Sequence, residues 1–150
     1  MADYKQVRIL SAPEAAYIAG VIDGEGTVAL TRKHRGENRQ LVVSISNTDF
    51  GLLEYIRDTV GAGRLTGKRT YRDHHTPSKT FTITNRQALR LLEQIVPYLR
   101  TYKAERAALI LKDYIRLTPR NGRYTTEQRQ ARSAFEQQVL NVPKVRQSVT

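Results

Sequence analysis

One acidic residue stands out as a candidate for chemistry because glycines flank it on both sides. Glu25 lies between Gly24 and Gly26, where an apolar run over residues 17–26 ends. Glycine adopts backbone conformations closed to other residues, so this turn can present a single carboxylate at a helix terminus. Where such carboxylates converge, they form sites for hard cations such as Mg²⁺, which also accepts carbonyl, water and phosphate oxygens.

The other residue types that perform chemistry are absent or poorly spaced. The sequence contains no cysteine, which excludes a cysteine nucleophile, cysteine-based zinc sites and a disulfide scaffold. His34, His74 and His75 fall near predicted hairpin tips, where contact with DNA or with solvent is a better interpretation than a zinc site. No phosphate-binding loop and no Gly-x-Ser-x-Gly elbow occurs, which argues against an NTPase or a serine hydrolase.

A helix must carry the Glu25 turn, and its start is well marked. Ser11 can accept a hydrogen bond from an early helical amide, Pro13 suits the first turn, and Glu14 completes a capping box. Ala19 and Gly20 favour a second helix packed closely against this one. A plain alternative is a buried amphipathic helix that ends in a glycine cap.

Two hairpins and further helices follow. Strands are expected over 27–34 and 39–47, and again over 64–72 and 78–84, because apolar and polar residues alternate there. Helices are expected from Thr48 or Asp49 to Val60, from the N-cap Asn85 to Pro97, over 101–117, and from Thr125 or Thr126 to Leu140. The order predicts a single α+β domain over 1–150, with an αββαββα core at about 13–117, a curved antiparallel four-stranded sheet backed by helices, and a helical extension over 118–150.

The charge is strongly positive and unevenly distributed. Lys and Arg number 25 against 14 Asp and Glu, which gives a net charge of +11. Segments 31–39 and 64–79 hold much of the excess, and clustered positive charge is typical of nucleic-acid-binding surfaces. A merely soluble basic surface is the alternative. The absence of cysteines, of a signal-like segment and of a membrane-length apolar run favours an intracellular protein, in a prokaryotic cytoplasm or an organelle matrix.

The polar face of the sheet is the predicted DNA-reading surface. Strands of about eight residues reach about 26 Å, close to eight base pairs of DNA. A β-ribbon fits the major groove, where polar and basic side chains read base edges. The predicted DNA contacts are Thr31, Lys33, Arg35, Gln40, Ser44, Thr66, Lys68, Thr70, Arg72, Thr80 and Thr82.

Residues 18–26 resemble, position for position, the signature of the LAGLIDADG homing endonucleases. The resemblance spans about residues 13–117 and implies a site-specific, Mg²⁺-dependent DNA endonuclease. It implies that Glu25 binds metal with help from the Gly24 carbonyl, that Asn47 lies near the nucleophilic water, and that Lys103 is catalytic. It also implies that Mn²⁺ replaces Mg²⁺ and that Ca²⁺ supports binding without cleavage. Alone, Asn47 could simply cap the next helix, and Lys103 could be a solvated side chain.

Only one signature occurs in the chain, so the close-packing helix needs a partner. We expect a homodimer that brings two Glu25 carboxylates together on a roughly palindromic site of about 20 base pairs. The predicted dimer interface comprises Ile18, Ala19, Gly20, Ile22 and Asp23. The alternative is a binding module on the same scaffold, either an RNA-binding intron maturase or a DNA-binding regulator that does not cleave. No membrane partner is expected.

Overall fold

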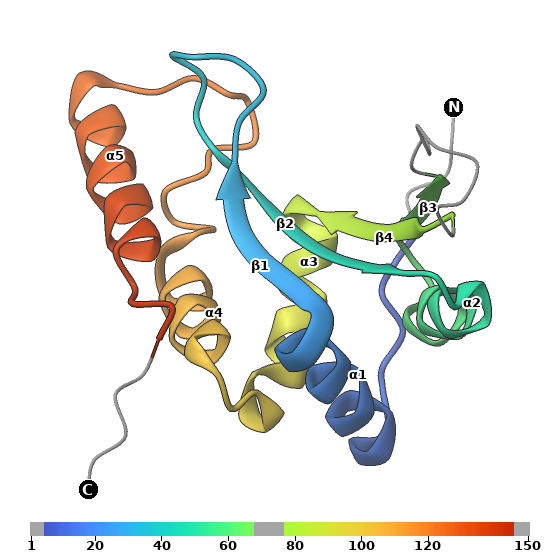
Figure 1. The fold of residues 1–150 in the computed structure, drawn as a ribbon. Helices are drawn as coiled ribbons and strands as arrows, with labels where there is room; N and C mark the ends of the chain where they lie inside the picture. The colour runs from blue at the N-terminus through green and yellow to red at the C-terminus, as the bar shows by residue number, and fades with distance from the viewer. Residues whose placement is uncertain (1–4, 68–76, 146–150) are drawn as a thin grey trace, which may run out of the picture.

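A four-stranded antiparallel sheet organises the fold, and helices cover one of its faces (Figure 1). The computed structural model describes residues 5–67 and 77–145. Within them lie α1 Ala12–Glu25, β1 Gly26–Thr31, β2 Gln40–Asn47, α2 Phe50–Val60, β3 Arg64–Gly67, β4 Lys79–Thr84, α3 Asn85–Ile95, the 3-10 turn η1 Val96–Tyr98, α4 Tyr102–Asp113 and α5 Thr126–Leu140. The predicted α+β class and αββαββα order are confirmed.

The strand order is β1-β2-β4-β3, so the two hairpins meet at the centre of the sheet. Thr31 pairs with Gln40, and Val42 pairs with Thr84. The first strand therefore ends at Thr31, earlier than predicted, and residues 32–39 form the connection. Gly36 adopts a φ of +93° there, which suits a turn and interrupts an extended strand. The predicted strand over 64–72 is described only to Gly67.

The core lies between the sheet and α1, α3 and α4, which pack against the same face (Figure 1). Leu41, Val43 and Ile45 of β2 are fully buried, and the residues between them are half-buried. This period of two is the one predicted for β2. The opposite face is covered by no helix among the described residues (Figure 1).

The helix ends follow local capping rules at most positions. Ser11 and Glu14 form the predicted capping box of α1, Asp49 caps α2, and Thr125 caps α5. The start of α3 differs from the prediction. Thr84 occupies the N-cap without a side-chain hydrogen bond, and Asn85 is the first helical residue, with a φ of +53°. The side chain of Asn85 is instead held by the Tyr114 hydroxyl, a contact remote in sequence.

α5 packs beside α4 and β1 rather than standing apart from the core (Figure 1). Phe135 and Val139 of α5 are buried in the same core cluster as the sheet. In the described ranges, no helix combines the length and the apolar character needed to cross a membrane.

Candidate functional site

Glu25 occupies the point where α1 passes directly into β1. The next residue, Gly26, is extended, and its amide donates to the Ile22 carbonyl. A Cβ on Gly26 would lie 2.8 Å from the Ile22 Cα atom, so only glycine lets the strand leave the helix this closely. The side chain of Glu25 is exposed. The structure thus displays one carboxylate at the junction of a helix and a sheet, as the sequence predicted.

Asn47, at the end of β2, is brought beside Glu25. Its Nδ2 atom donates a hydrogen bond to Glu25 Oε2, and its Oδ1 atom accepts one from the Asp49 amide at 2.7 Å. The pairing of Gly26 with Ile45 explains this proximity, because it aligns the start of β1 with the end of β2. Asn47 therefore orients the carboxylate and also connects it to the start of α2.

Lys103 contacts the backbone that carries the turn. Its side chain is only 6% exposed, and Nζ donates to the carbonyls of Ile22 at 2.7 Å and Asp23 at 2.9 Å. Burial lowers the pKa of this ammonium, although the Asp23 charge opposes the shift. The last turn of α1 contains no basic residue, so α4 supplies the positive charge that stabilises these helix C-terminal carbonyls.

Asp23 is hydrogen bonded within the chain, and its place in a dimer interface stays a prediction. Its carboxylate accepts from the amides of Arg100 at 2.7 Å and Thr101 at 3.1 Å, and from the Thr101 hydroxyl at 2.6 Å. Burial alone would raise its pKa, but these hydrogen bonds and nearby Lys103 leave the pKa lowered. The side chain of Asp23 thus binds the backbone at the start of α4, and the side chain of Lys103 binds the backbone at the end of α1.

The dimer-interface prediction is wrong for Ile18, Ala19 and Ile22. All three are 0% exposed because they face the chain's own sheet and helices. Gly20 lies on the opposite face of α1 and is exposed. That face borders a shallow depression of about 490 Å³ lined by Ala16, Tyr17, Gly20, Val21, Gly24, Glu25 and Leu52.

Sequence reasoning missed an apolar surface next to Glu25, which is formed by the exposed Tyr17 and the half-buried Val21 and Leu52. Tyr17 is 49% exposed and packs edge-on against Tyr55 of α2, with ring centroids 5.8 Å apart. The available signal was that α1 is apolar on all sides, which is unusual for a surface helix and indicates two buried faces. A strip of apolar surface therefore ends at the candidate carboxylate.

The predicted nucleic-acid contacts divide into three groups. Gln40, Ser44, Thr80 and Thr82 are half-buried, Thr31 and Thr66 are exposed, and all alternate with core positions on the helix-free face. Lys33 and Arg35 lie in the connection after β1 rather than on a strand, because pairing stops at Thr31. The predicted contacts Lys68, Thr70 and Arg72, like His74 and His75, lie outside the described residues.

A single chain supplies few metal ligands at this turn. Among residues 5–67 and 77–145, no group of three or more His, Cys, Asp or Glu side chains could hold an ion. Glu25 offers one exposed carboxylate, and neighbouring Gly24 offers a backbone carbonyl. These oxygens fit a hard cation whose other ligands come from outside the chain.

The comparisons with known proteins all find endonucleases. The sequence model of the LAGLIDADG endonuclease matches residues 18–117. The homing endonuclease I-CvuI, solved with its target and Ca²⁺, shares 18% identity and a TM-score of 0.71, over 93% of this chain and 87% of that one. The archaeal intron-encoded I-Vdi141I, complexed with DNA, shares 15% identity and a TM-score of 0.57, over 87% and 84%.

I-SmaMI, bound to cleaved DNA, shares 17% identity and a TM-score of 0.63 over 90% of this chain but only 46% of its own. At these identities the structural likenesses establish the fold. The family match covers most of the chain and includes the α1 turn, β2 and the start of α4, where Glu25, Asn47 and Lys103 lie. The chain belongs to the LAGLIDADG endonuclease family.

Proposed function

We propose that this protein is a site-specific double-strand DNA endonuclease that works as a homodimer and requires Mg²⁺. One observation carries the proposal. Glu25 is exposed beside Asn47 at the junction of α1 and the sheet, inside the segment that matches the endonuclease family. The solved relatives named above were crystallised with DNA, which supports DNA as the substrate.

Glu25 and the Gly24 carbonyl are the proposed metal ligands of each chain. A divalent ion held there would supply an activated water and would stabilise the leaving oxygen of the phosphodiester. Asn47 fixes the orientation of the Glu25 carboxylate through its amide. Lys103 and Asp23 hold the backbone of the turn in place from α4. Mn²⁺ is proposed to substitute for Mg²⁺, and Ca²⁺ to support binding without cleavage; structures of I-CvuI solved in the presence of Ca²⁺ or Mg²⁺ are consistent with a divalent ion.

The proposed DNA-binding surface is the helix-free face of the sheet. Threonine, serine and glutamine side chains line it, and these side chains hydrogen bond to base edges and phosphates. Arg35 and Lys33 in the adjoining connection add positive charge at one end. Each copy would cover one half of a roughly palindromic site.

The apolar strip on α1 is the proposed dimer interface. Gly20 lets a second helix approach closely, and Tyr17, Val21 and Leu52 supply apolar area around it. A two-fold arrangement would place both Glu25 side chains near the axis, because Glu25 lies at the end of this strip. The match to 46% of I-SmaMI also supports pairing, since that chain is long enough to hold two such units.

Replacing Gly20 with arginine tests the interface. A Cβ at position 20 meets nothing within 4 Å, so the variant should fold while its long charged side chain blocks the partner. Sedimentation should give about twice the chain mass of 17.1 kDa for the wild type and the chain mass for Gly20→Arg. Ala108→Arg, at an exposed position of α4, should leave the dimer intact. A dimeric Gly20→Arg protein would contradict the proposed surface.

A cleavage selection tests the activity. The wild-type protein is incubated with a randomised palindromic DNA library in Mg²⁺, and the cut ends are sequenced, with EDTA as the control. One enriched long sequence, cut on both strands at a fixed stagger only with Mg²⁺, is the expected result. Binding to DNA without cutting would contradict an endonuclease and favour a regulator, and binding only to RNA would favour a maturase.

A further inference from the structure

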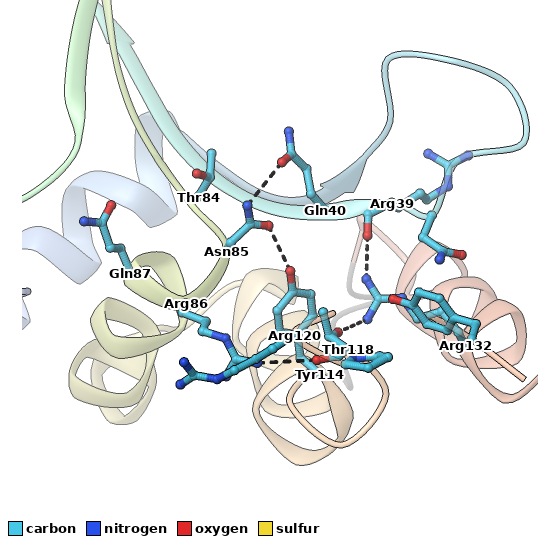
Figure 2. A pocket seen from close by; sticks show the side chains of 13 residues that line it. Arg39, Gln40, Thr84, Asn85, Arg86, Gln87, Tyr114, Thr118, Arg120 and Arg132 are labelled. Carbon is cyan, nitrogen blue, oxygen red and sulfur yellow. Dashed lines mark hydrogen bonds between the residues drawn. The ribbon is translucent and has the colours of Figure 1, made fainter. Parts of the chain in front are cut away.

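A second polar cavity lies away from Glu25, at the other end of β2 (Figure 2). It measures about 460 Å³ and is enclosed by the start of β2, the end of β4, the first turn of α3 and the connection between α4 and α5. Four arginines line it, Arg39, Arg86, Arg120 and Arg132, and none of its described lining residues is acidic. This composition favours a negatively charged ligand.

Arg132 shows that the cavity is a built feature rather than a gap between surface side chains. It is only 1% exposed, and its guanidinium donates to the Arg39 carbonyl at 2.5 Å and to the Thr118 hydroxyl (Figure 2). Its Nε atom is buried without a hydrogen-bond partner among the described residues, and lies 3.8 Å from a Glu136 carboxylate oxygen. A buried donor left unsatisfied in this way is costly unless a ligand or water reaches it.

Glu136 is an acid that contacts two of these arginines, and its carboxylate has partners within the protein. One of its oxygens accepts from the Arg39 amide at 2.8 Å, and the carboxylate lies between the Arg39 and Arg132 side chains. It therefore offsets one of the four positive charges of the cavity. Arg86 and Arg120 also line the cavity. Arg86 donates only a long hydrogen bond, 3.4 Å, to the Thr118 carbonyl, and Arg120 is exposed with no ion pair to a described residue.

The N-terminus of α3 also faces this cavity. Thr84, Asn85, Arg86 and Gln87 are all lining residues, and Thr84 makes no side-chain cap to the helix. Asn85 is instead held by the Tyr114 hydroxyl at 2.9 Å and by Gln40 at 3.3 Å (Figure 2). The first-turn amides of α3 thus lack a side-chain acceptor in the described structure, and they add partial positive charge to that of the arginines.

The cavity adjoins the proposed DNA-binding face. Gln40 and Thr84 belong to both, since they lie where the central strands β2 and β4 begin and end, and Arg86, Arg120 and Arg132 lie beneath this end of the sheet (Figure 2). A duplex on the sheet would pass its backbone over these strand ends, which are remote from Glu25. We infer that the cavity binds a phosphate group of the DNA backbone at the outer end of each half-site. This inference rests on the proposed function and adds a sequence-independent anchor to it.

Methylphosphonate substitution tests the inference with the full-length protein. The duplex recovered by the cleavage selection is made with one neutral methylphosphonate at each backbone position in turn, and its affinity is measured in Ca²⁺. One outer position should weaken wild-type binding by about tenfold, the loss of a charge-assisted hydrogen bond. With Arg120→Gln, the unmodified duplex should bind about tenfold more weakly, and the same methylphosphonate should then cost no more than about threefold. The number of counterions released on binding, obtained from the salt dependence of the affinity, should fall by about one.

Arg123→Gln is the matched control, because Arg123 is an exposed arginine of the same connection and does not line the cavity. It should keep the full methylphosphonate penalty. If Arg120→Gln leaves the penalty unchanged at every position, the inference is wrong even though binding and cleavage persist. The cavity is instead a site for free anions if millimolar inorganic phosphate raises the melting temperature of the wild type but not of Arg120→Gln, while the two proteins bind DNA equally well. Failure of all DNA binding would instead contradict the proposed function.

Discussion

Two turns of the molecule share the order helix, glycine, one residue, glycine, strand, yet they hold the middle residue differently. After α1, the helix extends to Glu25, the strand begins at Gly26, and Glu25 is exposed. After α2, Gly61 takes a φ of +78°, and Ala62 is buried at 2% exposure. The same pattern therefore displays its central side chain in one place and packs it in the other.

The difference lies in how each strand leaves its helix. Gly26 is extended and lies against the Ile22 backbone, so β1 continues from the last turn without a reversal. Gly61 and Gly63 both have positive φ and turn the chain back over the core, where Gly63 abuts the Phe81 ring. An acid is tolerated only at the first turn, because burial of an unpaired carboxylate at the second would be costly.

Ala62→Glu should break the second turn and gives the largest expected effect. An unpaired carboxylate at this buried position should lower the free energy of unfolding by about 3–5 kcal/mol. Urea denaturation followed by circular dichroism measures the change. Glu25→Ala is the control at the equivalent exposed position and should shift stability by about 0.5 kcal/mol or less. Equal losses for both variants would show that the two turns do not differ in burial.

Alanine substitutions at Gly63 and Gly24 test the difference between the two turns. In Gly63→Ala, the new Cβ would lie 2.5 Å from Phe81 Cε2 with φ at +96°, so stability should fall by about 2 kcal/mol. In Gly24→Ala, the Cβ meets nothing within 4 Å inside a helix, so stability should rise by up to about 1 kcal/mol. Thermal denaturation of the two variants should therefore shift in opposite directions, and a loss of stability in Gly24→Ala would count against the described turn.

Asp23→Asn addresses what fixes the first turn and has the smallest expected effect. The lowered pKa of Asp23 means that its contribution to stability is complete above the ordinary value of 3.8 and is lost as pH falls through the lower folded value. Asparagine should cost about 1 kcal/mol at neutral pH, since it retains one acceptor for the Arg100 and Thr101 amides that precede α4. The difference from wild type should shrink below pH 3.8 in urea titrations, and a difference independent of pH would contradict the assignment.

Elements with local signals could be predicted from the sequence. The Ser11 box of α1 and the Thr125 start of α5 depend on residues within one helical turn, and both are confirmed. The start of α3 was misplaced at Asn85, because the hydroxyl that binds this residue comes from Tyr114, remote in the chain. Strand β1 ended early because pairing, rather than the β-branched composition of the segment, decides where a strand stops.

The candidate site was predicted in part. Glu25 and Asn47, both named as site residues from the sequence, lie side by side, while their roles in chemistry stay predictions. Ile18 and Ile22 were assigned to a dimer because the small residues Ala19 and Gly20 predicted a close helix contact, and the sequence does not show which side chains of that helix face the chain's own core. The arginine cavity was not predicted for a related reason. The sequence of the helix that contains Arg132 is polar and predicts a solvated helix. Only the fold shows that the Arg132 guanidinium is buried against the start of β2.

The most direct test of the account is cleavage of the recovered DNA site by wild type and Glu25→Gln in Mg²⁺, with affinity measured in parallel in Ca²⁺. The isosteric change removes one negative charge at an exposed position and keeps an oxygen for the Asn47 amide. We predict that both-strand cleavage is lost while binding is unchanged or tighter, because a carboxylate repels DNA phosphates. Continued cleavage by a clean preparation of Glu25→Gln would contradict the assignment of Glu25 as the metal-binding acid.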